Sequence, residues 1–240
     1  MDEINHAGGA SREKIEAMFN SISGNYDRLN RILSFGTDRR WRRRVIDLIG
    51  HHLKPERILD VATGTGDMAI AAMKLDPEKI TGIDISEKML ALGRKKISRL
   101  GHESKVELLT GDSEKIMFPD RTFDVAMSAF GVRNFEDTSA ALGEIFRVLR
   151  PGGMITVLEF SKPSWFPVKQ FYSFYFTRIL PRIGKKVSGD PEAYSYLPES
   201  VLNFPDDEDF LNLLRGAGFI RTGQKKMTGG IASIYYGFRP

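Results

Sequence analysis

A glycine-rich turn between two regular segments constrains the fold of this 240-residue chain more than any other feature. Residues 57–62 form a short apolar run typical of a buried strand, and residues 68–75 have the spacing of a helix. Between them stands Asp60-Val-Ala-Thr-Gly64-Thr-Gly66-Asp67. Glycines at such a point allow a sharp turn and a close approach of the backbone to a ligand. The sequence therefore predicts a strand–turn–helix unit that binds a nucleotide-like molecule.

The same alternation of short apolar runs and helical patterns continues along the chain and predicts an α/β fold with a parallel sheet. Strands are expected at 57–62, 80–83, 106–109, 123–127 and 154–160. Helices are expected at 68–75, 87–99, 139–149 and 206–215, the third of them stopped by Pro151 and Gly152. A strand pattern at 231–238 suggests a closing antiparallel pair.

Two helices are expected before the first strand. Apolar residues from Ile15 to Leu33 recur at steps of three and four, with an interruption at Gly24. Thr37 or Asp38 can cap a second helix. Its inner face is predicted to hold Trp41, Val45, Leu48 and Ile49, and its outer face Arg39, Arg40, Arg42, Arg43 and Arg44. Such a basic run either grips phosphates or is simply a solvated helix face, the commoner case.

We interpret the chain as one domain with additions. The expected parts are an N-terminal helical addition at 1–52, a ligand-binding core at 53–160, an inserted aromatic cap at 161–204, and a C-terminal helix with closing strands at 205–240. With no cysteine, and four histidines outside any metal-ligand pattern, a metal site is not expected. No signal peptide or membrane span is found, which predicts a cytoplasmic protein. The net charge of +4 would suit an anionic membrane surface or nucleic acid.

Two acidic positions extend the predicted ligand site. Asp84 ends the second strand, where a carboxylate can accept hydrogen bonds from the ribose hydroxyls of an adenosine ligand. Asp112 and Ser113 follow the third strand, where a carboxylate can accept from an adenine amine; a helix cap at Asp112 is the alternative. The glycines and Asp84 fit a nicotinamide cofactor as well as other adenosine ligands.

The order of these motifs, completed by Leu149-Arg-Pro-Gly-Gly153, resembles the class I S-adenosylmethionine-dependent methyltransferases. That resemblance implies a Rossmann-like sheet of seven strands with the last one antiparallel. It also implies that Gly64 and Gly66 receive the methionine half of the cofactor.

Further segments resemble the menaquinone and ubiquinone C-methyltransferase family. They are Phe19-Asn-Ser-Ile-Ser-Gly-Asn-Tyr26-Asp27-Arg-Leu-Asn30, Ser34-Phe-Gly36, Trp41-Arg42, Ala129-Phe-Gly131-Val-Arg133-Asn134, Leu158-Glu-Phe-Ser-Lys-Pro163 and Leu180-Pro-Arg-Ile-Gly184. This resemblance places the contacts of S-adenosyl-L-methionine on Thr65, Asp84, Asp112, Ser113 and Ser128. The chain departs from the pattern at Ser113, where many members have alanine, and at Thr63, where some have glycine.

The resemblance also implies a lipid quinol as methyl acceptor. Deprotonating a quinol hydroxyl makes the adjacent ring carbon nucleophilic, so Arg133 is a candidate to stabilise the quinolate, and Asp67 or Asp27 to take protons. Tyr26 and Asn30 are candidate substrate contacts. Each candidate has a plainer alternative: Arg133 pairs with Glu136 or Asp137, Asp27 caps or bridges helices, and Asp67 complements a helix dipole.

The stretch Trp165–Phe176 is rich in aromatic residues and is followed by cations, which suits the interface of an anionic bilayer. A cap packed on the sheet, or a contact in a homodimer, is the alternative. Competing functions are another small-molecule or RNA methyltransferase, a nicotinamide-dependent oxidoreductase and a non-enzymatic nucleotide sensor. Nucleic acid is not an expected partner, because no further RNA-binding module is present.

Overall fold

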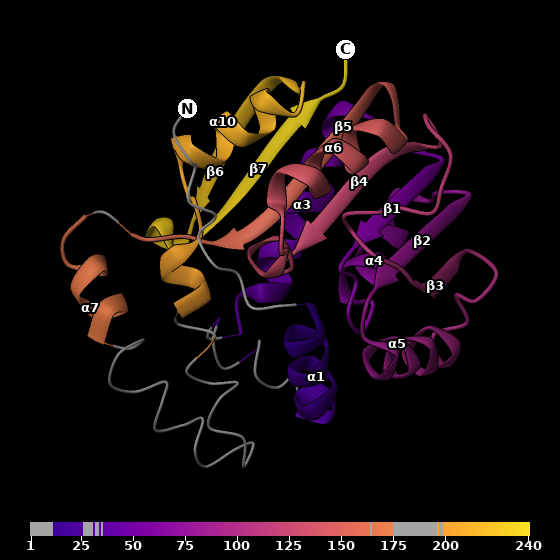
Figure 1. Ribbon diagram of the computed structural model, residues 1–240, viewed down its shortest axis with the longest axis horizontal. Coiled ribbons are helices and arrows are strands. Elements are labelled where there is room, and N and C mark those ends of the chain that lie inside the picture. The colour runs from indigo at the N-terminus through magenta and orange to yellow at the C-terminus, as the bar shows by residue number, and fades with distance from the viewer. Residues whose placement is uncertain are drawn as a thin grey trace.

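The computed structural model describes residues 12–25, 31, 34, 36–163, 165–174, 196 and 199–240. Its strands are β1 Arg57–Val61, β2 Lys79–Asp84, β3 Val106–Thr110, β4 Phe123–Ala129, β5 Leu149–Phe160, β6 Ile220–Met227 and β7 Ala232–Phe238. They form one seven-stranded sheet in the order β3-β2-β1-β4-β5-β7-β6 (Figure 1).

Strands β1 to β5 pair in parallel, whereas β7 runs antiparallel to both β5 and β6. This confirms the expected seven-stranded sheet with an antiparallel last strand. The chain order reverses between β1 and β4, which are neighbours in the sheet. In open α/β sheets, ligands bind beyond the carboxyl ends of the strands at such a reversal. The topology therefore predicts the position of the site.

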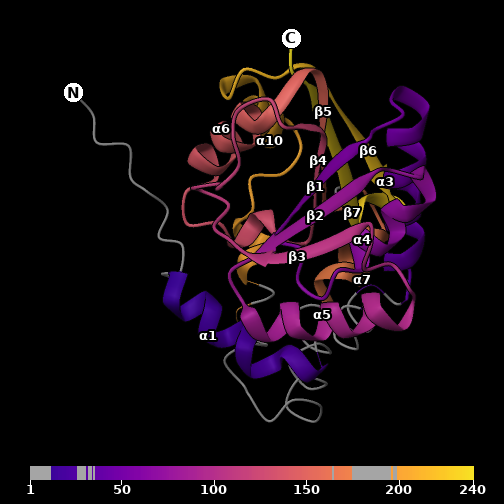
Figure 2. The ribbon, with the colours of Figure 1, turned by 90° about the vertical axis from the view of Figure 1, so that its right-hand side faces the viewer.

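Helices cover both faces of the sheet. They are α1 Arg12–Ile22, α3 Asp38–His52, α4 Asp67–Ala72, α5 Glu87–Arg99, α6 Thr138–Val148, α7 Val168–Phe174 and α10 Glu208–Gly216. Buried residues of α3, α4 and α5 share one apolar cluster, and those of α6 and α10 share another. Figure 2 shows these two groups on opposite sides of the sheet, with α1 beside α5. Short 3-10 helices span Ser23–Asn25, Met73–Leu75, Val132–Asn134 and Thr228–Gly230.

The predicted strands and helices agree with the structure within a few residues, apart from one notable shift, but β6, the partner of the closing strand β7, was not placed from the sequence. Helix α6 ends at Val148, before Pro151, and β5 already begins at Leu149, five residues before the predicted start at Met154. The backbone of Leu149 is extended, with φ −73° and ψ 146°, so the helix stops before the proline can interrupt it. The Arg-Pro-Gly-Gly segment thus belongs to the strand.

The predicted basic face of α3 is wrong at one position. Arg39, Arg40, Arg43 and Arg44 are exposed, but Arg42 is only 6% exposed. Arg42 turns inward because its guanidinium pairs with the buried carboxylate of Asp38, one helical turn earlier. Thr37 is the N-cap residue, without a side-chain capping bond. The predicted interruption at Gly24 is confirmed, since α1 ends at Ile22 and a 3-10 helix spans Ser23–Asn25.

Candidate active site

A pocket opens at the carboxyl ends of the central strands, where the topology predicts it. It encloses about 710 Å³ of empty space, part of which is open to solvent. Four predicted cofactor residues line it, namely Gly64, Asp84, Asp112 and Ser113. Ile15 and Phe19 of α1 close the pocket from the N-terminal side.

The glycine turn is held in a left-handed backbone conformation that favours glycine. Gly64 has φ 56° and Gly66 has φ 78°, and Gly66 is the N-cap of α4. The backbone N–H of Gly64 donates to Asp84 Oδ2 at 2.8 Å, which ties the turn to the end of β2. Two predicted contact regions are therefore brought together by one hydrogen bond.

Asp84 is placed to accept hydrogen bonds in the pocket. Oδ1 accepts from the Ser86 N–H at 2.9 Å and Oδ2 from Gly64, so each oxygen keeps capacity for a further donor. Burial raises the pKa of Asp84, and the backbone N–H donors act against that rise. A half-buried carboxylate with free acceptor capacity suits a pair of ribose hydroxyls.

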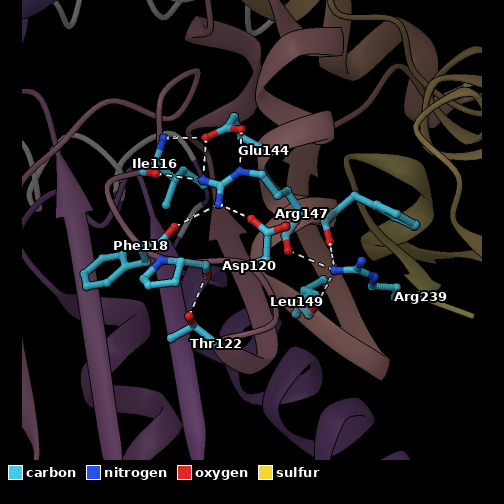
Figure 3. Close-up of polar contacts among 10 residues, drawn as sticks. Ile116, Phe118, Asp120, Thr122, Glu144, Arg147, Leu149 and Arg239 are labelled. Carbon is cyan, nitrogen blue, oxygen red and sulfur yellow. Dashed lines mark hydrogen bonds and ion pairs between the residues drawn. The ribbon is translucent and has the colours of Figure 1, made fainter.

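The loop carrying Asp112 and Ser113 is held by a network around Arg147 on α6. Arg147 donates to Glu144, to Asp120 and to the carbonyl oxygens of Ile116 and Phe118 (Figure 3). Asp112 Oδ1 accepts from the Glu114 N–H at 2.9 Å, which closes the start of the same loop. The network thus holds residues 116–120, which directly follow the pocket residues Asp112 to Glu114 in the same loop.

A tight contact forms the wall beyond β4. A Cβ added to Gly131 would lie 2.5 Å from Ala62 Cβ, so only glycine fits there. The same added atom would lie 3.1 Å from Ser128 Oγ. Ser128 is 2% exposed, and its hydroxyl has no hydrogen-bond partner among the described residues. The ring of Phe130 also lines the pocket.

Asp60, the first residue of the predicted motif, has a structural role that the motif alone did not predict. It is fully buried, and Oδ2 accepts from Thr63 Oγ1 at 2.6 Å and from the Ala69 N–H at 3.0 Å. Oδ1 has no partner in the described part of the chain. Burial raises the pKa of Asp60 to about 7, mainly by penalising the charged form. The sequence did offer one signal for this role, because Asp60 is a charged residue inside the otherwise apolar run of β1.

Arg133 lies just beyond the carboxyl end of β4, as predicted, but its side chain turns into the protein. Its side chain is 2% exposed, and Nη1 donates to both carboxylate oxygens of Glu159. Glu159 takes the place of the expected partners Glu136 and Asp137. Asn134, next in sequence, lines the pocket and accepts from the Tyr196 hydroxyl at 3.1 Å. Burial raises the pKa of Glu159, and the Arg133 charge opposes that rise.

Asp67 does not line the pocket. It pairs with Lys96 Nζ at 2.6 Å, and the same ammonium donates to Thr65 Oγ1 at 2.7 Å. Burial acts to raise the pKa of Asp67, but the charges of Arg42 and Lys96 outweigh it, so the pKa is lowered. A carboxylate with a lowered pKa is a weaker base. Tyr26, Asp27 and Asn30 lie outside the described residues.

The residues present fit S-adenosyl-L-methionine. The lining side chains carry four carboxylates, on Asp84, Asp112, Glu114 and Glu136, which suits a ligand with a sulfonium and an ammonium group. The hydroxyl of Ser128 and Oδ1 of Asp60 are buried polar atoms that have no hydrogen-bond partner among the described residues. Thr65 and Gly66 lie beside the pocket in the same turn.

Comparison with known proteins decides the family. The model of the ubiE/COQ5 methyltransferase family matches residues 8–239. The chain belongs to this family. S-adenosyl-L-methionine is therefore the expected methyl donor, and the enzyme class is a methyltransferase.

Curated relatives in this family match over nearly their whole length. The ubiquinone/menaquinone biosynthesis C-methyltransferase UbiE of Geobacter sulfurreducens is 47% identical over 94% of this chain and 88% of its own. The demethylmenaquinone methyltransferase of Thermus thermophilus is 46% identical over 93% of this chain and 100% of its own. The demethylmenaquinone methyltransferase of Bacteroides fragilis is 42% identical over 95% of this chain and 93% of its own.

Solved structures share the fold at low sequence identity. The [4+2]-cyclase SpnF is 18% identical with a TM-score of 0.69, over 98% of this chain and 99% of its own. A SAM-dependent methyltransferase from Thermotoga maritima is 20% identical with a TM-score of 0.65, over 94% and 100%. A cyclase and a methyltransferase thus share one architecture, so the family match and not the fold decides the chemistry.

In the described ranges, no helix is both long enough and apolar enough to cross a bilayer. The same ranges contain no group of three or more side chains arranged to hold a metal ion.

Proposed function

We propose that this chain transfers the methyl group of S-adenosyl-L-methionine to a ring carbon of a polyprenylated quinol. The observation that carries the proposal is the match to demethylmenaquinone and ubiquinone/menaquinone methyltransferases along almost the whole chain. The acceptor is a demethylmenaquinol, a ubiquinol precursor, or both. The acid-lined pocket at the sheet reversal supports the same function, because it suits a cationic adenosine cofactor.

In the proposed site, Asp84 binds the ribose, Asp112 and Ser113 bind the adenine, and the turn with Gly64 and Thr65 receives the methionine half. When bound, the cofactor supplies an electrophilic methyl group on sulfur. The protein's work is to hold the ring carbon in line with that methyl at about 3–3.5 Å. The bond from methyl to sulfur breaks, a bond from methyl to ring carbon forms, and the ring carbon then loses its proton.

The quinol must lose a hydroxyl proton to become nucleophilic at carbon, and we assign Arg133 to stabilising that quinolate. Arg133 follows β4 directly, with the pocket residues Gly131 and Asn134 on either side of it in sequence. Its charge is held in a low-dielectric setting, where it acts strongly on nearby groups. Asp27 is the candidate proton acceptor on the N-terminal segment, with Tyr26 and Asn30 as substrate contacts; the ion pair of Asp67 with Lys96 makes Asp67 the weaker candidate.

A ligand-binding experiment and an activity assay test the proposal together. S-adenosylhomocysteine should raise the melting temperature, whereas NADH should not, because only a ligand that favours the folded state stabilises it. Methyl transfer should then occur to the reduced quinol and not to the oxidised quinone, which has no hydroxyl to deprotonate. Stabilisation by NADH alone would replace this proposal with an oxidoreductase.

The long tail of such an acceptor places the substrate in a membrane, so we further propose peripheral association with the inner face of the cytoplasmic membrane. Four exposed arginines on α3 and the exposed rings of Trp165 and Phe166, 59% and 73% exposed, support it. Replacing Trp165 and Phe166 by serine should reduce turnover of long-tailed quinols in anionic liposomes more than turnover of a short soluble analogue. Equal losses would indicate a cap that only supports the fold, or a homodimer contact, which sedimentation would reveal.

A further inference from the structure

Arg42 is a buried guanidinium whose hydrogen-bonding capacity is largely unused. It is 6% exposed, and Nη1 donates to Oδ2 of the buried Asp38. Nε is buried without a partner, and the described part of the chain shows no other hydrogen bond from this side chain. A guanidinium carries five N–H donors, and burying them unpaired is costly. Two carboxylates, on Asp38 and Asp67, lie beside the guanidinium, but most of its N–H groups have no acceptor among the described residues. Such a group has room for a further anionic partner.

The position of Arg42 links it to the glycine turn and to the pocket. Nη1 lies 3.8 Å from Oδ2 of Asp67, the residue directly after Gly66. Cζ lies 5.6 Å from the ring centroid of Phe130, which lines the pocket. Arg42 does not line the cofactor pocket itself; it lines a neighbouring hollow together with Asp67 and Lys96. Its guanidinium lies close to both the glycine turn and Phe130, so it stands just behind the pocket.

The charges around the pocket show which part of the cofactor lacks a partner. The described lining residues include four carboxylates and no lysine, arginine or histidine. S-adenosylmethionine carries a sulfonium and an ammonium group, which suit such a lining, but also an α-carboxylate, which does not. A cation just behind the lining would complement that carboxylate.

We propose that Arg42 binds the α-carboxylate of the cofactor's methionine half. Two other cations near the site have other roles or fuller hydrogen bonding: Arg133 faces both oxygens of Glu159 and is assigned above to the quinolate, and Lys96 bonds Asp67 and Thr65. Asp38, itself bonded by the Ser34 hydroxyl at 3.1 Å, orients Arg42 and leaves its remaining donors available. A planar guanidinium matches a carboxylate with paired hydrogen bonds.

This inference rests on cofactor use but is tested by binding alone. Calorimetry compares S-adenosylhomocysteine with methylthioadenosine, which keeps the adenosine and the sulfur but has no amino-acid carboxylate. Arg42→Met should weaken binding of S-adenosylhomocysteine about tenfold or more and leave methylthioadenosine within about twofold, as expected when one charge-assisted contact is lost. Arg43→Met, an exposed neighbour on α3, is the matched control and should change neither.

A second comparison does not depend on the folding of a variant. The wild-type chain should bind S-adenosylhomocysteine about tenfold or more tightly than its α-carboxamide, which has no charge at that position, and Arg42→Lys should reduce this preference. Equal wild-type affinity for the acid and the amide would overturn the assignment of Arg42, as would equal weakening of both ligands in Arg42→Met. Failure of the wild type to bind S-adenosylhomocysteine at all would instead overturn the proposed function.

Discussion

Arg133 Nη1 lies 3.1 and 3.0 Å from the two carboxylate oxygens of Glu159, and both side chains are sealed from solvent, at 2% and 0% exposure. The pair joins the segment after β4 to the end of β5, just behind the pocket wall. Breaking a buried pair at one partner is far more destabilising than replacing both partners. A test of Arg133 in catalysis must therefore distinguish the loss of its charge at the quinolate from the loss of protein stability.

Replacing the pair as a unit separates these effects. Arg133→Ala should lower turnover by about 100-fold while cofactor affinity stays within about threefold, because one electrostatic stabiliser of the quinolate is lost. The double variant Arg133→Gln/Glu159→Gln should regain thermal stability and not turnover. The limiting pKa of the pH–rate profile should rise in Arg133→Ala, since the quinol hydroxyl loses a cation that favours ionisation. Wild-type turnover in the folded double variant would make the pair purely structural.

Asp84 is expected to dominate cofactor binding. Asp84→Ala should weaken S-adenosylmethionine by about 2 kcal/mol or more, since the ribose loses a charged acceptor and the Gly64 N–H loses its partner. Calorimetry measures the change, with Asp76→Ala as an acidic control on the protein surface. Unchanged affinity in Asp84→Ala would refute the ribose assignment.

Asp60 should make the stability of the ligand-free protein depend on pH. Its pKa is about 7 in the folded chain, against 3.8 as its usual value. Between these values the folded chain holds a proton that the unfolded chain has released, so the free energy of unfolding falls as the pH rises. Asp60→Asn should remove up to about 4 kcal/mol of that fall between pH 4 and 7. Urea unfolding at several pH values measures the free energy of unfolding of the wild type and of Asp60→Asn. The same pH dependence in both proteins would contradict the raised pKa.

Two glycines give a matched pair of substitutions. Gly131→Ala should destabilise the fold and weaken cofactor binding, because the new methyl would lie 2.5 Å from Ala62 Cβ. Gly143→Ala in α6 has open space and should instead stabilise the protein by about 0.5–1 kcal/mol, since alanine restricts the unfolded chain and favours the helix. Thermal unfolding of both variants, with and without S-adenosylhomocysteine, measures these effects. Equal changes in melting temperature for the two variants would contradict the tight contact at Gly131.

Local sequence patterns predicted the sheet, the glycine turn and the acids at the strand ends, because each depends on a run of neighbouring residues. The Arg133–Glu159 pair was not predictable, since its members are 26 residues apart and meet only through the pairing of β4 with β5. Arg42 left a weaker signal: Asp38, Arg42 and the buried Ile46 lie four residues apart, on one stripe of a helix. The division of the chain into core and cap stays a prediction.

The central claim, carbon methylation of a quinol, is tested most directly by following the methyl group itself. The protein is incubated with S-adenosylmethionine carrying a deuterated methyl group and with demethylmenaquinol in detergent, and the product is examined by mass spectrometry and NMR. The account predicts one deuterated methyl bonded to a ring carbon, equal formation of S-adenosylhomocysteine, and loss of both in the Asp84→Ala variant. A label on oxygen, or cofactor turnover without a labelled ring carbon, would contradict it.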